Sequence, residues 1–188
     1  MKNYSKKDTI FLKLAKVIIK SEVTDNNLDI YLDKYKISKE EFYSLFPKKI
    51  VSLSKFYFQK TYINAFKNCK SKVIKEKSIS KKTNLITMEF LKIFCNNSNL
   101  SKFFINYTFL RPFLFSKLIY NVASNIWYDI GDKSIDFNFY TKRLILYNVL
   151  KNSLFYWNKS LDLKKTLVFT ENQVKFFGKI GKYKSIGK

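Results

Sequence analysis

Charged, polar and aromatic side chains that could bind or react are concentrated in one stretch, WYDIGDKSIDFNFYTKR, which runs from Trp127 to Arg143. It contains two carboxylates, Asp132 and Asp136, and it ends on two adjacent cations. Gly131 can adopt the positive φ that ends a helix, and an acidic residue in a first turn stabilises the helix that follows. We expect the charged residues either to pair with one another across this helix junction or to contact a partner.

Two adjacent aromatic residues in the same stretch, Phe139 and Tyr140, indicate a contact surface. Neighbouring residues on a helix point in different directions, so the two side chains cannot both face the core. Exposed aromatic side chains are enriched at protein interfaces. We therefore expect at least one of the two to lie on the surface.

The absence of histidine excludes most of the catalytic chemistry that such residues could support. The chain cannot form a Ser-His-Asp or Cys-His nucleophile, an HExxH zinc site or a histidine-supported di-iron centre. Cys69 and Cys95 lie far apart without CxxC spacing and are expected to be buried or idle thiols in a reducing compartment. Paired-carboxylate and phosphate-loop motifs are also lacking. We expect no enzyme activity, no metal and no cofactor.

The formal charge of +22 would attract a polyanion such as nucleic acid or an anionic membrane. Almost all of it comes from lysine, because Arg111 and Arg143 are the only arginines. Lysine, asparagine, isoleucine and aromatic residues are enriched together while glycine and alanine are scarce, a profile typical of AT-rich codon usage. We attribute the charge partly to codon bias and partly to function.

No apolar run reaches the roughly 18 residues that span a bilayer. The longest, FFINYTFLRPFLF, is interrupted by Arg111. The first residues, MKNYSKKDTI, lead into an amphipathic pattern without an apolar or arginine-rich signal. These features predict a cytoplasmic protein, of bacterial type, that does not span a membrane.

Scarce glycine and proline, with apolar residues at helical spacing, predict an all-α protein. We expect a first helix capped by Asp8, a second from near Asp25, a third capped by Ser38, and a long fourth helix after Pro47. Five further helices are expected at about 82–95, 99–110, 112–130, 135–157 and 161–177. Ser98 and Ser134 are candidate caps among them, and Pro112 is expected near a helix start.

The short helices at the start, with a tight turn between the second and third, are typical of a helix-turn-helix head. The polar stretch CKSKVIKEKSISKKTN marks a boundary with a larger helical body. We expect three regions: the head with the long fourth helix over residues 1–69, the body over 70–177, and a basic tail over 178–188.

The layout of head and body resembles TetR-like repressors, and SKEEFYSLFPKKIVSL resembles their third and fourth helices. The second half resembles a narrower group. Its W..IGDKSIDFNFYTKR, followed by LFYW and S.D..KT...TENQV, is similar to the signature of the ubiquinone (coenzyme Q) biosynthesis accessory protein of the Coq-nine family, which spans residues 127–177 here. The chain departs from that signature at Ile130 for alanine, Ile135 for threonine and Phe139 for tryptophan.

This resemblance implies a TetR-like helical bundle that carries lipid and is not an enzyme. Family members dimerise through the body, hold isoprenoid lipids where repressors hold inducers, and assist the di-iron hydroxylase that modifies demethoxyubiquinone. For this chain it implies an isoprenoid or ubiquinone-precursor ligand, a homodimer joined through the last two long helices, docking on the inner membrane and no specific nucleic acid. The expected lipid-binding residues are Leu114, Leu118, Trp127, Phe137, Leu144 and Tyr147.

The resemblance also implies two contact regions. Phe139 and Tyr140 lie where the family's partner surface lies, so they are expected to contact the hydroxylase, with Asp136 and Arg143 at the edge. The ending FFGKIGKYKSIGK is expected to contact the membrane, because each lysine near an anionic leaflet contributes about 1 kcal/mol. The residues expected to do so are Phe176, Phe177, Lys179, Lys182 and Tyr183. The alternative is a frayed, solvated tail.

The second candidate function is a TetR-type DNA-binding transcriptional regulator. The helix-turn-helix layout and the positive charge favour it. Against it, Glu40 and Glu41 lie in the helix that would enter the DNA groove, where carboxylates are repelled by phosphates.

Overall fold

The computed structural model describes residues 2–132 and 136–186, with side chains described over 6–132 and 138–176. Over these ranges the chain forms nine α-helices and no strand, which confirms the all-α fold expected from the sequence. The helices are α1 (Lys2–Ile18), α2 (Leu28–Lys34), α3 (Lys39–Leu45), α4 (Lys49–Lys75), α5 (Ile79–Asn96), α6 (Ser98–Phe109), α7 (Pro112–Asp129), α8 (Asp136–Ser160) and α9 (Leu163–Ile186).

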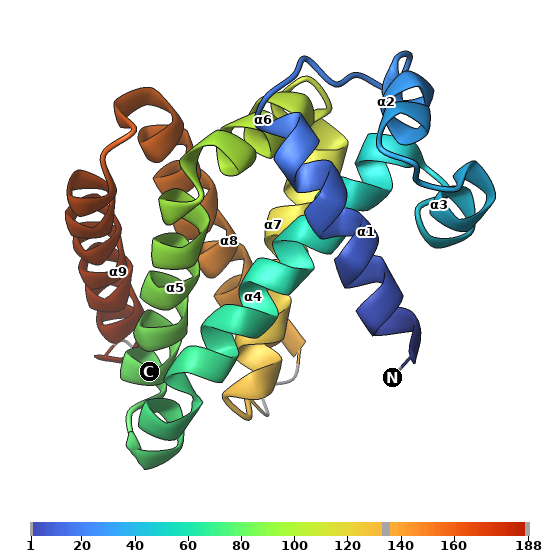
Figure 1. The fold of residues 1–188 in the computed structure, drawn as a ribbon. Coiled ribbons are helices and arrows are strands. Elements are labelled where there is room, and N and C mark those ends of the chain that lie inside the picture. Colours follow the sequence, from blue (N-terminus) through green and yellow to red (C-terminus); the bar gives the residue numbers. More distant parts are fainter. Residues whose placement is uncertain (1, 133–135, 187–188) are drawn as a thin grey trace.

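The short helices α2 and α3 sit at one end of the molecule, and the long helices form the rest (Figure 1). α4 crosses the molecule diagonally and packs along α5, while α8 packs against α7 and α9. α5 also packs on α9, so it lies between the α4 side and the α9 side of the bundle. Across the part of the chain that the structure describes, no helix has the length and apolarity needed to cross a membrane.

One aromatic core joins the head to the body. Phe11 of α1 stacks on Tyr57 of α4 with ring centroids 6.0 Å apart, and Phe104 of α6 stacks on the same ring at 4.8 Å. Phe94 of α5 contacts Tyr57 at 5.5 Å and Trp157 of α8 at 5.9 Å. Rings at such separations add to the stabilisation that burial provides. The core therefore crosses the boundary expected at 69/70, which falls inside α4.

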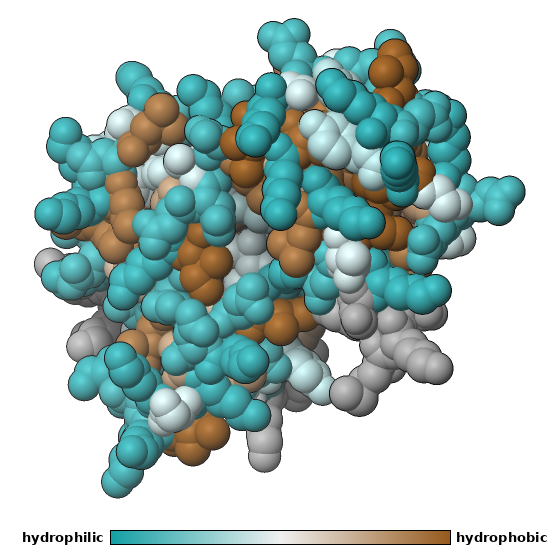
Figure 2. Space-filling view, in the orientation of Figure 1, coloured by the Kyte–Doolittle hydropathy of each residue, from teal (hydrophilic) through white to brown (hydrophobic). Residues whose placement is uncertain are grey.

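Apolar side chains are not confined to this core. On the face seen in Figure 2, hydrophilic side chains are spread broadly, with apolar patches between them. The exposed apolar side chains include Leu110 and Phe113 at the turn between α6 and α7, and Phe155 of α8. Large exposed apolar groups of this kind mark surfaces where contact with another molecule would remove them from water.

The helix starts confirm some expected caps and correct others. The Ser38 hydroxyl accepts from the Glu41 backbone N–H at 3.3 Å, and Pro112 is the first residue of α7, as expected. Asp8 is not a cap, because α1 begins at Lys2 and Asp8 pairs with Lys60 of α4. Ser98 is not a cap either, since it is already the first residue of α6. Ser134 lies outside the described residues.

Asp25 does not begin the second helix, which starts at Leu28. Its carboxylate instead accepts from the Ile50 backbone N–H at 3.2 Å and from the Tyr107 hydroxyl at 2.7 Å. Arg111 lies 3.5 Å from the same carboxylate. Burial and this hydrogen bond raise the pKa of Tyr107, so it stays protonated and donates. Asp25 therefore fastens the head loop to α4 and α6.

Candidate functional site

α7 ends in a glycine turn that sets the direction of the chain before α8. Gly131 has a φ of 79°, as expected for a residue that ends a helix cheaply. Its N–H donates to the Tyr128 carbonyl at 3.0 Å, and the Asp132 N–H donates to the Trp127 carbonyl at 3.1 Å. This pair of bonds is the Schellman closure of a helix end. It fixes the position at which Asp132 leaves α7.

Asp132 forms a buried ion-pair cluster with two cations of α8. Its carboxylate lies 2.8 Å from the Lys142 ammonium and 3.4 Å from the Arg143 guanidinium. The side chains of Asp132 and Arg143 are only 2% and 6% exposed. We call these three residues the Asp132 cluster. Of the two alternatives for the charged residues, pairing across the junction holds for these three, while the Asp136 side chain lies outside the described residues.

Trp127 is fastened to the same cluster. Its indole N–H donates to the Lys142 carbonyl at 3.1 Å, and the Lys142 ammonium lies 5.3 Å from the centre of the indole ring. This hydrogen bond satisfies the indole N–H, so the rest of the ring can lie against apolar side chains. Trp127 therefore holds one orientation between α7 and α8.

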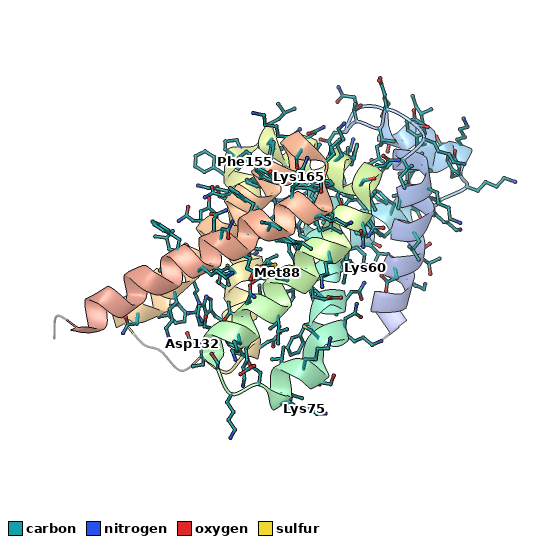
Figure 3. The ribbon with its side chains drawn as sticks, turned by 90° about the vertical axis from the view of Figure 1, so that its left-hand side faces the viewer. Lys60, Lys75, Met88, Asp132, Phe155 and Lys165 are labelled. Atoms are coloured by element: carbon teal, nitrogen blue, oxygen red, sulfur yellow. The ribbon has the colours of Figure 1, made fainter. Side chains whose placement is uncertain are left out.

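A cavity of about 410 Å³ opens next to Trp127, between α5, α7, α8 and α9. This volume falls in the range of roughly 300 to 1,000 Å³ that is typical of small-molecule sites. Its lining is mostly aliphatic and consists of Ile79, Ser80, Thr83, Trp127, Lys142, Ile145, Leu146, Val149 and Val174. Figure 3 shows Asp132 at this end of the molecule, below α9 and near the first turns of α5. The Asp132 cluster and the cavity thus share Lys142.

The residues expected to bind lipid do not share one pocket. Trp127 lines the cavity, but Leu118 lines a separate groove of about 240 Å³ between α4 and α7. Leu144 and Tyr147 line an open depression between α7 and α8, and Leu114 packs against the core. The Phe137 side chain lies outside the described residues. The expected lipid pocket around Leu144 and Tyr147 is therefore a shallow surface feature.

Sequence reasoning missed the five aliphatic residues of the cavity, Ile79, Ile145, Leu146, Val149 and Val174. The stretch LILYNVLKNSLFYW is apolar on nearly every side, so its periodicity does not reveal which face borders a cavity. One feature of the sequence could have indicated those on α8. Ile145, Leu146 and Val149 lie within two helix turns of Lys142, which contacts Trp127.

The aromatic pair lies on the surface beside the Asp132 cluster. Tyr140 is 66% exposed, as expected for at least one of the two, and its ring centroid lies 5.1 Å from that of Phe139. The Arg143 guanidinium stacks 3.3 Å from the centre of the Phe139 ring and donates to the Phe139 carbonyl at 2.9 Å. Arg143 was expected at the edge of this surface. It is buried instead, because its charge is paired with Asp132 beneath the ring.

The tail continues the last helix. α9 was expected to end near residue 177 and runs on to Ile186, extending past the neighbouring helices in Figure 3. Phe176 is exposed. The side chains of the other residues expected at the membrane lie outside the described ones: Phe177, Lys179, Lys182 and Tyr183.

The charges around the expected recognition helix do not favour DNA binding. Glu40 and Glu41 are both exposed in the first turn of α3. Lys39 lies 2.7 Å from Asp33, and Lys6 lies 3.6 Å from Glu41, so the nearby cations have carboxylate partners. The DNA-binding alternative gains no support from this geometry.

Comparison with known proteins gives a family match in the second half of the chain. The COQ9 family model matches residues 114–181, a segment that spans most of α7, all described residues of α8 and most of α9. It includes the glycine turn, the Asp132 cluster and the aromatic pair. No curated protein and no solved structure matches the chain.

Proposed function

We propose that this chain, a member of the COQ9 family by the match over residues 114–181, holds an isoprenoid ubiquinone precursor and presents it to a di-iron demethoxyubiquinone hydroxylase. In this role the chain is a carrier and not a catalyst. The proposal is supported mainly by the apolar cavity, which six residues of the family segment line together with the first turns of α5.

The energetics of isoprenoid lipids favour a carrier with such a cavity. Each buried CH₂ group contributes about 0.8 kcal/mol, so a five-carbon isoprene unit exposed to water costs roughly 4 kcal/mol. Several units therefore need shelter along their whole path out of the bilayer. The aliphatic walls formed by Ile145, Leu146 and Val149 are suited to an isoprenoid chain.

We propose that the lipid enters from a membrane docked at the end of α9. Val174 lines the cavity, and the exposed Phe176 follows it by half a turn on the same helix. The sequence beyond carries Lys179 and Lys182 without any acidic residue. Lysines of this kind contribute about 1 kcal/mol each beside an anionic leaflet, enough together for reversible docking. The cavity would then open close to the bilayer surface.

We propose Phe139 and Tyr140 as the centre of the hydroxylase contact. The Asp132 cluster joins the two sites, because Lys142 lines the cavity and Arg143 supports the Phe139 ring. A lipid held in the cavity would therefore lie one helix turn from the surface that meets the partner. The protein is further proposed to be a homodimer joined through α8 and α9.

The proposal is tested by measuring the hydroxylation of demethoxyubiquinone in vesicles with two variants. One should lose lipid binding and the other should lose hydroxylase binding. Ile145→Trp fills the cavity, so it should bind the hydroxylase but carry little lipid. The double variant Phe139→Ala, Tyr140→Ala should carry lipid but bind the hydroxylase weakly. Each should lose most of the stimulation that the wild-type chain gives. Full stimulation by both variants would contradict the proposed function.

A further inference from the structure

We propose that the hairpin between α4 and α5 is a membrane-contact site, which places exposed isoleucines in an anionic lipid bilayer and brings the mouth of the cavity to it. This inference rests on the proposed function, since it concerns how the same cavity meets the membrane. We call residues 67–82 the α4–α5 hairpin. They comprise the last turns of α4, the connection 76–78 and the first turn of α5. The hairpin lies outside the segment that matches the COQ9 family model.

The α4–α5 hairpin lies at the cavity end of the molecule. Ile79, Ser80 and Thr83 of α5 line the cavity, and Ile79 is also 49% exposed, so it borders both the cavity and the solvent. In Figure 1 the hairpin forms the lower tip of the molecule, at the same end as the last described turn of α9. Figure 3 shows Lys75 at this tip. A bilayer that met the tip would therefore lie close to the cavity.

The tip exposes two large aliphatic side chains. Ile74 is 69% exposed in the last turn of α4, although its neighbour Val73 is buried, and Ile79 is the first residue of α5. Figure 2 shows an apolar patch among hydrophilic side chains at the lower tip. Transfer of such side chains from water into the acyl region of a bilayer is favourable. The two isoleucines therefore give the hairpin an apolar contact with lipid.

Lysines surround these isoleucines. The hairpin contains seven of them and a single acidic residue, Glu76. Among the described residues none of the seven makes an ion pair, and all are exposed except the half-buried Lys82. Lysines of this kind are attracted to the negative surface of an anionic leaflet. They are Lys67, Lys70, Lys72, Lys75, Lys77, Lys81 and Lys82.

The acidic residues of this end do not cancel the positive charge of the hairpin. The Glu76 carboxylate accepts from the Ser78 backbone N–H at 2.8 Å, so it is used to close the connection between the helices. The α7–α8 junction contains three carboxylates, those of Asp129, Asp132 and Asp136. The hairpin keeps a surplus of positive charge even if all of these are counted against its seven lysines.

The combination of lysines with exposed isoleucines fits an anionic bilayer better than nucleic acid. The phosphates of nucleic acid bind lysine but provide no apolar phase that would take up an isoleucine. A bilayer provides both, because anionic head groups cover its acyl chains.

Vesicle sedimentation of the full chain tests this site. The vesicles contain phosphatidylglycerol and phosphatidylcholine, and pure phosphatidylcholine vesicles and duplex DNA are titrated beside them. The hairpin variant is Lys72→Gln, Ile74→Ser, Lys75→Gln, which leaves every residue of the cavity lining in place. It should bind the anionic vesicles at least about tenfold more weakly than the wild type, since each lysine alone contributes several-fold.

The matched control makes the same substitutions in the head. Ile30 is 66% exposed, and Lys34 and Lys48 are exposed, so Ile30→Ser, Lys34→Gln, Lys48→Gln also removes one exposed isoleucine and two lysines. Its affinity for anionic vesicles should stay within about twofold of the wild type, because charges farther than about 10 Å from the leaflet are screened at moderate salt.

A fluorescent label gives a second measurement that does not depend on the triple variant folding. Cys69 and Cys95 are buried, so an environment-sensitive thiol dye should react with a cysteine introduced on the surface. On Ile74→Cys its emission should shift to the blue when anionic vesicles are added. On Ile30→Cys it should not shift.

Unchanged vesicle affinity of the hairpin variant, or no shift of the label at residue 74, would overturn the inference and leave the cavity and the hydroxylase contact of the proposed function standing. Equal losses in the hairpin and head variants, equal binding of neutral and anionic vesicles, or a loss of DNA affinity alone would overturn it too. If the wild type bound no vesicles, the membrane docking proposed for the end of α9 would fail as well.

Discussion

The head and the cavity end of this molecule bury different kinds of groups. In the head, Leu28, Leu32, Phe42 and Phe46 are fully buried, and ion pairs such as Lys39 with Asp33 stay on the surface. At the cavity end the Asp132 cluster is buried, an aliphatic cavity stays open and Tyr140 is exposed. Buried charges and unfilled apolar space both reduce stability compared with a packed core. The two ends therefore differ in how their buried groups contribute to stability.

The largest expected effect breaks the Asp132 cluster. Asp132→Ala leaves the buried Arg143 without its anion, and losing one partner of a buried ion pair costs about 3 to 5 kcal/mol. Urea unfolding measures this loss. Glu171→Ala, which removes an exposed pair with Lys175, should change the unfolding free energy by less than about 1 kcal/mol. Similar losses in the two variants would show that burial of the cluster is unimportant.

The aromatic pair should affect association more than stability. Replacing Phe139 and Tyr140 by alanine should weaken hydroxylase binding by more than about 1 kcal/mol, because aromatic anchors carry much of an interface's energy. Titration of the hydroxylase measures it, and the amount of bound lipid should be unchanged. A double variant that keeps full hydroxylase affinity but loses lipid or stability would mean that the pair belongs to the core.

The glycine turn gives a smaller effect. A Cβ added at Gly131 would meet nothing within 4 Å, so Gly131→Ala carries only the strain of a positive φ. That strain is about 1 kcal/mol. Thermal unfolding should detect it, and Gly131→Asn, which tolerates positive φ better, should recover part of the loss. An alanine variant as stable as the wild type would contradict the assigned role of the turn.

An effect of a different kind is expected at high pH in the core between head and body. Burial raises the pKa of Tyr57 from 10.0 and of Cys95 from 9.0, each to about 12. Between these values the folded chain keeps protons that the unfolded chain releases, so the unfolding free energy falls as pH rises through this window. Urea midpoints at about pH 8 and pH 11 measure the loss. Tyr57→Phe should show a smaller decrease, and an equal decrease would exclude Tyr57 as a contributor.

The sequence predicted local features better than long-range ones. Helical spacing indicated every helix, and the glycine turn and the Ser38 cap followed from residue types at adjacent positions. The bonds that join Asp25 to Ile50 and Tyr107 could not be predicted this way, because they connect residues that are distant in sequence. The ion pair of Asp8 with Lys60 could not be predicted either, because Lys60 belongs to another helix. Asp8 was therefore expected to be a cap.

The candidate site was only partly predictable for the same reason. The residue types from Gly131 to Arg143 indicated a charged junction with an aromatic surface, and both are present. The way in which α7 and α8 cross decides which charges are buried. Arg143 is buried by this packing, whereas we expected it at the edge of the contact surface. The cavity depends on the packing of four helices, and among the expected lipid residues whose side chains are described, only Trp127 lies in it.

Extraction of the purified protein followed by lipid mass spectrometry shows whether the cavity holds an isoprenoid lipid. The matched variants are Ile145→Trp, which fills the cavity, and Val168→Trp, which adds the same side chain at an exposed position of α9. We expect isoprenoid lipid in the wild-type chain and in Val168→Trp, and little or none in Ile145→Trp. No isoprenoid lipid in the wild type, or an equal amount in Ile145→Trp, would contradict it.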